Sequence, residues 1–307
     1  MKITTYDNRA LKEIHTWKNP ELGWGEQAMR VINWPLNKAG DLVLATPGVG
    51  DAIKLTIQGL TGVCNDIAQW SIQKNKIYAE FRKAGHDGIQ KEGDVFDIHL
   101  EEVDKIVGWL DAKYKGLALV EGTGTGAIGL PGIPTDLVAL ISMNLRAIGE
   151  YATYYGFNVK LQEERLFAMN VLGLASSPTD ASKELAMAQL VRIAQDVAKK
   201  RTWKELEKHA FVQVIQQIAK ALGIRLTKAK LAQVIPVAGA AIGGGFNAYF
   251  TSKVCDAAFY LYRERFLAQK YGAEVIEVTV EPAQNIDPGY PEESEDIPDG
   301  MMPHLDL

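Results

Sequence analysis

Two glycine-rich stretches decide how this chain folds: EGTGTGAIGLPGIPTD at residues 121–136 and VIPVAGAAIGGGFN at residues 234–247. Glycine inside a helix costs about 1 kcal/mol relative to alanine, so repeated glycines need a compensating reason. Gly122 and Gly126 lie four residues apart, as do Gly239 and Gly243. In a helix this spacing makes a smooth face against which a second helix backbone can pack. We therefore expect two glycine-rich helical hairpins in the middle of the protein.

Helical spacing of apolar residues extends through most of the remaining sequence. We expect helices at about residues 24–44, 51–74, 101–115, 136–155, 161–174, 180–200, 202–223 and 246–271. The last of these should end at Gly272, because glycine commonly follows a helix C-terminus. Residues 85–97 are typical of a loop, and only residues 274–280 alternate like a strand, with no evident strand to pair with. The sequence therefore predicts an all-α protein.

Length and composition are those of an ordinary globular protein, with 307 residues, 47% apolar residues and 23% charged residues. The two cysteines, Cys64 and Cys255, exclude a disulfide scaffold and fit both the core and a reducing compartment. No apolar run typical of a signal peptide begins the sequence, so we expect a cytoplasmic protein. We divide the chain into an N-terminal extension at 1–23, one helical domain at 24–272 and an acidic, proline-rich tail at 273–307.

The tail concentrates the negative charge of the chain. Residues 282–307 contain seven acidic residues, five prolines and no lysine or arginine, whereas the rest of the chain carries 33 basic and 31 acidic residues. Such a segment buries too little apolar surface to order itself, so we expect it to be flexible. Its end regains apolar side chains, which makes residues 299–307 a candidate docking motif for a protein partner, although an inert tail is the commoner case. No basic stripe with interleaved aromatic residues occurs, so we expect no nucleic-acid partner.

The second glycine-rich stretch raises the question of membrane insertion. Residues 231–252 carry no charge, and these 22 residues approach the roughly 20 needed to span a bilayer. Pro236, Asn247 and three consecutive glycines lower the hydrophobicity, and in the first stretch Asp136 ends the uncharged segment after 14 residues. The pattern favours a hairpin buried in a soluble protein over a peripheral or conditionally inserted segment, and both over a transmembrane span.

A nucleotide-binding pattern also occurs in the first stretch. Residues 124–129 match G-x-G-x-x-G, and residues 117–120 are a candidate strand before it. In a dinucleotide fold an unbroken helix starts at the third glycine and directs its N-terminus at the pyrophosphate. Pro131 and Pro134 break that helix here, and no series of βα units follows. We therefore expect no nucleotide and no other cofactor.

Polar residues near the glycine-rich stretches are the candidate ligand-binding positions. Asp136 and Asn144 are eight residues apart and so share one face of the expected helix, with Leu140 between them. Asp136 is most simply a helix N-cap, but a polar pair on an apolar face also suits a pocket for a head group. The full candidate set is Asp136, Asn144, Asn247, Gly126, Gly129, Gly132, Gly239 and Gly243.

Patterns for catalysis and metal binding are weak elsewhere. No H-E-x-x-H or G-x-S-x-G motif occurs. The histidines and aspartates at residues 86–99 are more typical of a solvated loop than of a metal site, and we expect no metal. Arg146 and Glu150 suit a surface ion pair. The charged residues at 163–165 and 263–265 suit solvated or structural positions better than catalytic ones.

Two sets of residues carry a family resemblance. In the first half they are Gly126, Gly129, Pro131, Gly132, Asp136, Asn144, Tyr155, Gly156, Glu164 and Arg165, and in the second half Ile235, Pro236, Val237, Gly239, Ala240, Ile242, Gly243, Asn247, Thr251, Ala257 and Ala258. In order and spacing they resemble the bacterial EcsC family, over about residues 24–270. Through the family's association with an ABC transporter, the resemblance implies a role near the membrane. It implies no reaction and no catalytic residues.

These observations leave three classes of function open. The leading hypothesis is a non-enzymatic, membrane-associated or lipid-binding protein, cytoplasmic or peripheral at the inner membrane face. In it the two glycine-rich stretches pack around an apolar groove, with Asp136, Asn144 and Asn247 as the polar points inside. An alternative is a hydrolase that uses carboxylates such as Asp136, Glu163 or Glu164 around a metal ion or a water molecule. A third is a protein that docks a partner through residues 299–307.

Overall fold

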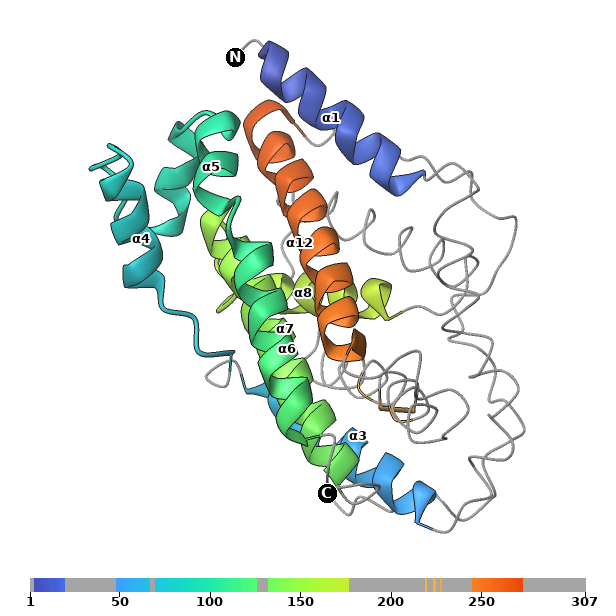
Figure 1. The fold of residues 1–307 in the computed structure, drawn as a ribbon. Helices are drawn as coiled ribbons and strands as arrows, with labels where there is room; N and C mark the ends of the chain where they lie inside the picture. The colour runs from blue at the N-terminus through green and yellow to red at the C-terminus, as the bar shows by residue number, and fades with distance from the viewer. Residues whose placement is uncertain are drawn as a thin grey trace. The chain divides into compact units, whose positions relative to one another are not determined.

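A computed structural model describes residues 3–19, 48–66, 70–125, 132–176, 219, 223–224, 227 and 245–272. By its contacts the chain divides into two units, Met1–Glu277 and Val278–Leu307, and all described residues belong to the first. The regular elements of the described residues are helices (Figure 1), so the protein is all-α, as the sequence predicts.

The elements follow one another along the chain as helices of 8 to 27 residues with one 3₁₀ turn between them. They are α1 (Thr5–Lys18), α3 (Val49–Asn65), α4 (Lys74–Lys83), the 3₁₀ helix η2 (Glu92–Asp97), α5 (Leu100–Val107), α6 (Leu110–Thr125), α7 (Ile133–Tyr154), α8 (Gln162–Ala175) and α12 (Gly245–Tyr271).

The helix α7 forms the centre of this arrangement. It contacts α3, α4, α6, α8 and α12, and most of its side chains are buried. A helix that is apolar on nearly every face belongs in a protein core. Its neighbour α6 is antiparallel to it, because Lys113 near the start of α6 pairs with Glu150 near the end of α7. The last helix, α12, packs against α1, α6, α7 and α8 (Figure 1).

Several helices match the sequence prediction closely. The expected helices at 136–155, 161–174 and 246–271 correspond to α7, α8 and α12 within three residues at each end. The helix α12 ends where predicted, and Gly272 after it has a φ of 115°, a left-handed conformation that favours glycine.

The predicted helix at 51–74 is wrong in its second part. The helix α3 ends at Asn65, and α4, which the sequence did not predict, begins only at Lys74. Between them Trp70 is fully buried, and its indole N–H donates to the backbone carbonyl of Val63 at 3.3 Å. A buried tryptophan contributes more apolar area than any other side chain and also needs a hydrogen-bond acceptor. Trp70 fulfils both requirements from the segment between α3 and α4, where the predicted helix is interrupted.

Other expectations change in detail or lie outside the described residues. The predicted helix at 101–115 is divided into α5 and α6 at residues 108–109, and the predicted loop at 85–97 ends in η2. The candidate strand at 117–120 is helical, which removes the strand that a dinucleotide fold requires. The expected helices at 24–44 and 180–200, the strand at 274–280, the flexible tail and most of the expected helix at 202–223 lie outside the described residues. So do residues 126–131 of the first glycine-rich stretch and residues 234–244 of the second.

Membrane-spanning potential can be stated for the described helices alone. None of them has both the length and the apolar character that crossing a bilayer demands.

Close packing of α3 on α7 depends on Gly59. A methyl group at this position would clash with Cγ2 of Val138 on α7, whereas a methyl group at Gly62, in the same helix, would meet nothing within 4 Å. Because Val138 is β-branched, its χ1 angle is stiff and it adapts poorly to an added group. The missing side chain at Gly59 therefore sets how closely the two helices approach.

We expect Gly59→Ala to destabilise the protein and Gly62→Ala to stabilise it. Overpacking costs about 1–3 kcal/mol, which exceeds the gain of about 1 kcal/mol from replacing a helical glycine. At Gly62 only the gain remains. Thermal unfolding of both variants beside the wild type measures the difference, and a Gly59→Ala protein that melts above the wild type would contradict the close contact.

Candidate functional site

The candidate ligand-binding residues that the structure describes all lie at helix starts or in buried helix interiors. Asp136 lies in the first turn of α7, Gly132 at its N-cap position and Asn144 in its middle. Asn247 lies in the first turn of α12. The remaining candidates lie outside the described residues: Gly126, Gly129, Gly239 and Gly243.

Asn144 contacts Thr251 where α7 packs against α12, and Asn247 lies one helical turn from Thr251. The side-chain amide of Asn144 donates to the backbone carbonyl of Leu140 at 2.8 Å and to Oγ1 of Thr251 at 3.2 Å. Thr251 follows Asn247 by one helical turn, so the two share a face of α12. All three polar side chains are at least 99% buried. We call Asn144, Asn247 and Thr251 the amide site.

The amide site is only partly satisfied. Three of its atoms have no hydrogen-bond partner, namely Oδ1 of Asn144 and both Oδ1 and Nδ2 of Asn247. Buried polar atoms in proteins are nearly always paired, and each orphan costs about 1–3 kcal/mol. Asp136 does not supply the missing bonds to Asn144, because eight residues place it about 12 Å away along the helix axis. The three predicted polar points are thus buried, and the printed contact of Asn144 across the helices is with Thr251.

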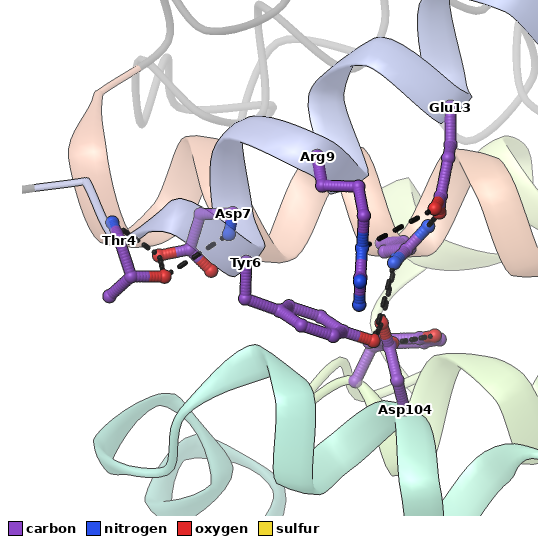
Figure 2. Close-up of polar contacts among 8 residues, drawn as sticks. Thr4, Tyr6, Asp7, Arg9, Glu13 and Asp104 are labelled. Atoms are coloured by element: carbon purple, nitrogen blue, oxygen red, sulfur yellow. Dashed lines mark hydrogen bonds and ion pairs between the residues drawn. The ribbon is translucent and has the colours of Figure 1, made fainter.

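A charged cluster lies where α1, α5, α7 and α12 meet, and Figure 2 shows its contacts. Arg263 donates from Nε to Asp104 at 2.7 Å and from Nη1 to Glu13 at 2.6 Å. The hydroxyls of Tyr6 and Tyr155 donate to the same Asp104 at 2.8 and 2.7 Å. We call these five residues the Arg263 cluster. It joins the N-terminal helix α1, itself opened by the Thr4–Asp7 capping box, to α12.

The two residues after Arg263 are buried charges as well. Glu264 pairs with Lys18 of α1 at 2.6 Å. Arg265 donates to both oxygens of Glu164 on α8, each at 2.6 Å, and its guanidinium lies near the ring of Phe167, 4.3 Å from the centroid. All three side chains are buried. The structural expectation for residues 263–265 is thus confirmed, and the solvated one is wrong.

Burial and neighbouring charges shift the pKa values of several groups: burial raises the pKa of the Asp104 carboxyl, although Arg263, Tyr155 and Tyr6 oppose this shift. Burial raises the pKa of Tyr155 well above its ordinary value, and Asp104 raises it further, so its hydroxyl stays a neutral donor. Burial lowers the pKa of Arg263, but Asp104 and Glu13 more than offset this and raise it, so the guanidinium stays charged. Burial alone raises the pKa of Cys64 to about 12, which leaves a thiol rather than a nucleophilic thiolate. These shifts suit structural roles better than acid–base catalysis.

Glu150 differs from its prediction as a partner in a surface ion pair. It does pair with Arg146 at 3.3 Å, but its side chain is buried and also bonds Lys113 of α6. The apolar spacing of α7 places Glu150 on the side that α6 covers.

Of the carboxylates in the hydrolase hypothesis, Glu164 is engaged in an ion pair. Both oxygens of Glu164 accept from Arg265, so they are not free to activate water. Asp94 belongs to residues 86–99, which were considered above as a metal site. Its carboxylate accepts hydrogen bonds from the backbone N–H groups of residues 90 and 91, both at 3.0 Å. Within the described ranges, no three His, Cys, Asp or Glu side chains gather in a way that would hold a metal ion.

Comparison with known proteins identifies the family. Residues 8–267 match the profile of the EcsC protein family. The chain belongs to the EcsC family. The match begins earlier than residue 24, where we expected the resemblance to start, and so includes most of α1, the helix that the Arg263 cluster joins to α12.

Two relatives of Bacillus subtilis (strain 168) are similar to this EcsC-family chain. The protein named Protein EcsC is 27% identical over 197 residues, which cover 64% of this chain and 78% of the relative. Uncharacterized protein YdbA is 26% identical over 205 residues, which cover 66% of this chain and 72% of the relative. No solved structure matches the chain.

We expect the Arg265–Glu164 pair to behave as one buried unit. Arg265→Met or Glu164→Leu alone should destabilise the protein by about 3–5 kcal/mol, because each leaves an uncompensated buried charge. The double variant should recover most of that loss. Urea unfolding of the wild type, both single variants and the double variant measures the coupling.

A surface pair provides the control. Lys105 lies 3.4 Å from Glu101 with both side chains about half exposed, so Lys105→Ala should change stability little. Strictly additive effects at Arg265 and Glu164 would contradict the buried pair.

Proposed function

We propose that this EcsC-family protein is a non-enzymatic, lipid-binding protein that attaches peripherally to the inner face of the membrane. The observation that carries the proposal is an exposed apolar face on α6. It consists of Leu117, Leu119 and Val120 of α6 together with Trp109, which directly precedes the helix; their exposed fractions range from 44% to 74%. We call these four residues the α6 apolar face.

The α6 apolar face is the outer side of a helix whose inner side is apolar as well. Its opposite side holds Leu110, Tyr114 and Ala118, which are fully buried against the core. Single exposed apolar residues are ordinary, but several on one helix face mark an interaction surface. Lys113 lies among them, 5.0 Å from the ring of Trp109, but it and Lys115 are paired with Glu150 and Asp111. Exposed apolar side chains with an aromatic ring suit the interface of a bilayer.

The sequence that follows α6 supports the same assignment. After α6 ends at Thr125, the chain carries no charged residue until Asp136. A bilayer surface can therefore contact the helix without meeting a charge along the following segment, which favours a lipid surface over a polar protein partner. The two buried, free cysteines fit the reducing, cytoplasmic side of the membrane.

The amide site adds neutral, partly unpaired groups to an apolar interior, and no charged group with catalytic potential. The described residues offer no comparable support for a hydrolase. Docking through residues 299–307 stays a prediction, since these residues lie outside the described part of the chain.

Vesicle flotation tests the attachment. Purified full-length protein should float with vesicles that contain phosphatidylglycerol, and Leu117→Gln/Val120→Gln should reduce the bound fraction about tenfold or more. The reason is that each partly inserted apolar side chain contributes on the order of 1 kcal/mol.

Leu161→Gln is the matched control for this experiment. Leu161 is about as exposed as Leu119, but it follows the C-terminal end of α7, whereas Val120 lies near the end of α6 that leads to the start of α7. The control should float like the wild type. Wild-type protein that stays at the bottom with anionic and neutral vesicles alike would refute the proposal.

A further inference from the structure

We propose that the N-terminal helix α1 is a strap that opens and closes over α12 while the other described helices stay folded. The proposal goes beyond lipid binding and does not involve the α6 apolar face. Its starting point is that α1 packs mainly against α5 and α12, and that most of the contacts which hold it there are polar.

The helix α1 buries little apolar surface. Of its 14 residues, the buried ones are Asp7, Ala10 and Ile14, and only two of these are apolar. Its larger apolar side chains are partly buried: Tyr6, Leu11 and Trp17. In the central helix α7, by contrast, most side chains are buried. Because apolar burial is the main favourable term in helix packing, α1 is held less firmly than α7 and can open without it.

The Arg263 cluster divides into an inner part and an outer part. In the inner part Arg263 donates to Asp104 of α5 at 2.7 Å, and Tyr155, which follows α7, donates to the same carboxylate at 2.7 Å. The outer part is supplied by α1 and consists of Tyr6 and Glu13 (Figure 2). The side chain of Glu13 is 44% exposed and so is already partly hydrated. When α1 leaves, Arg263 and Asp104 therefore stay paired with each other.

The other polar contacts of α1 can be exchanged for contacts with water. Lys18 pairs with Glu264 at 2.6 Å, and the hydroxyl of Tyr271 donates to Asp7 at 2.6 Å. The attraction within a buried ion pair is largely offset by the cost of removing both charges from water, and opening returns that hydration. A hydrogen bond likewise contributes only a small net free energy, because water replaces it in the open state. These contacts fix where α1 docks, but they hold it weakly.

Opening exposes a surface of α12 that the closed strap covers. Trp17 of α1 stacks on Tyr260 of α12, with the ring centroids 5.0 Å apart and the planes at 20°. Departure of α1 separates these rings and uncovers the side of the Arg263 guanidinium that Glu13 contacts. The strap therefore controls access to an aromatic and cationic surface of the last helix.

Thiol labelling of Ala10→Cys tests the proposal in the full chain. Ala10 is fully buried, so a thiol at this position reacts with N-ethylmaleimide only when α1 opens. The native cysteines, Cys64 and Cys255, are buried and free and serve as internal controls for opening of the core. The introduced thiol should react about 100-fold faster than either of them or more, since local opening is that much more frequent than global unfolding. Equal reaction rates of all three thiols would overturn the proposal.

Hydrogen exchange of the wild type keeps the proposal testable if Ala10→Cys disturbs folding. The amides of residues 9–18 should exchange faster than those of α7. Their exchange should also depend less on urea, because opening of one helix exposes less surface than global unfolding does. Exchange of α1 and α7 at the same rate, with the same dependence on urea, would overturn the strap.

Ile14→Ala and Lys12→Gln complete the experiment as a matched pair on α1. Ile14 is 2% exposed, whereas Lys12 is exposed. Loss of the buried side chain in Ile14→Ala should speed exchange of α1 by about 30-fold or more and leave α7 unchanged, and Lys12→Gln should change neither helix. Equal acceleration of α1 and α7 in Ile14→Ala would show that the two helices open only together and would overturn the proposal. No acceleration of α1 would also overturn it, because exchange would then arise from fraying of the helix ends.

Discussion

Three consecutive buried charges on α12 are the constraint on which the rest of this structure depends. Successive residues of a helix point about 100° apart, so Arg263, Glu264 and Arg265 face three different directions. A buried charge without a partner costs several kcal/mol. The partners come from α1 and α5 for Arg263, from α1 for Glu264 and from α8 for Arg265. The last helix can therefore be buried only when helices from the whole length of the described chain surround it.

The buried polar groups at the two ends of α12 differ in how completely they are paired. Near its C-terminal end the three buried charges are each paired with an opposite charge from another helix, so they lock helices together. Near its N-terminal end the buried groups are neutral and partly unpaired. A fully paired charge has no hydrogen-bonding capacity left for another group, whereas an unpaired amide has. The same helix thus joins a structural clamp to a region of unpaired amides, and the exposed apolar residues of the neighbouring α6 are the surface that we propose contacts lipid.

Much of the fold could be predicted from the spacing of apolar residues along the chain. The exceptions depend on contacts of single residues that this spacing does not reveal. The spacing of apolar residues locates α7, α8 and α12 closely, and a glycine marks the end of α12. The error at residues 66–73 arises because burial of Trp70 against Val63 and α7 outweighs helix continuation. For the candidate site, helical spacing could place Asn144 on an apolar face, but it could not show that Thr251 meets it from another helix.

The linear order of residues was enough to establish the all-α class and the EcsC resemblance, because both rest on spacing within short segments. Which charges are buried, and which polar atoms lack partners, depends on residues far apart in the chain. Arg263 and Glu13 are 250 positions apart, Arg265 and Glu164 are 101, and Asn144 and Thr251 are 107. Such pairs depend on how whole helices pack. The free-energy cost of burying a polar group is determined by whether another helix supplies a hydrogen-bond or ion-pair partner for it.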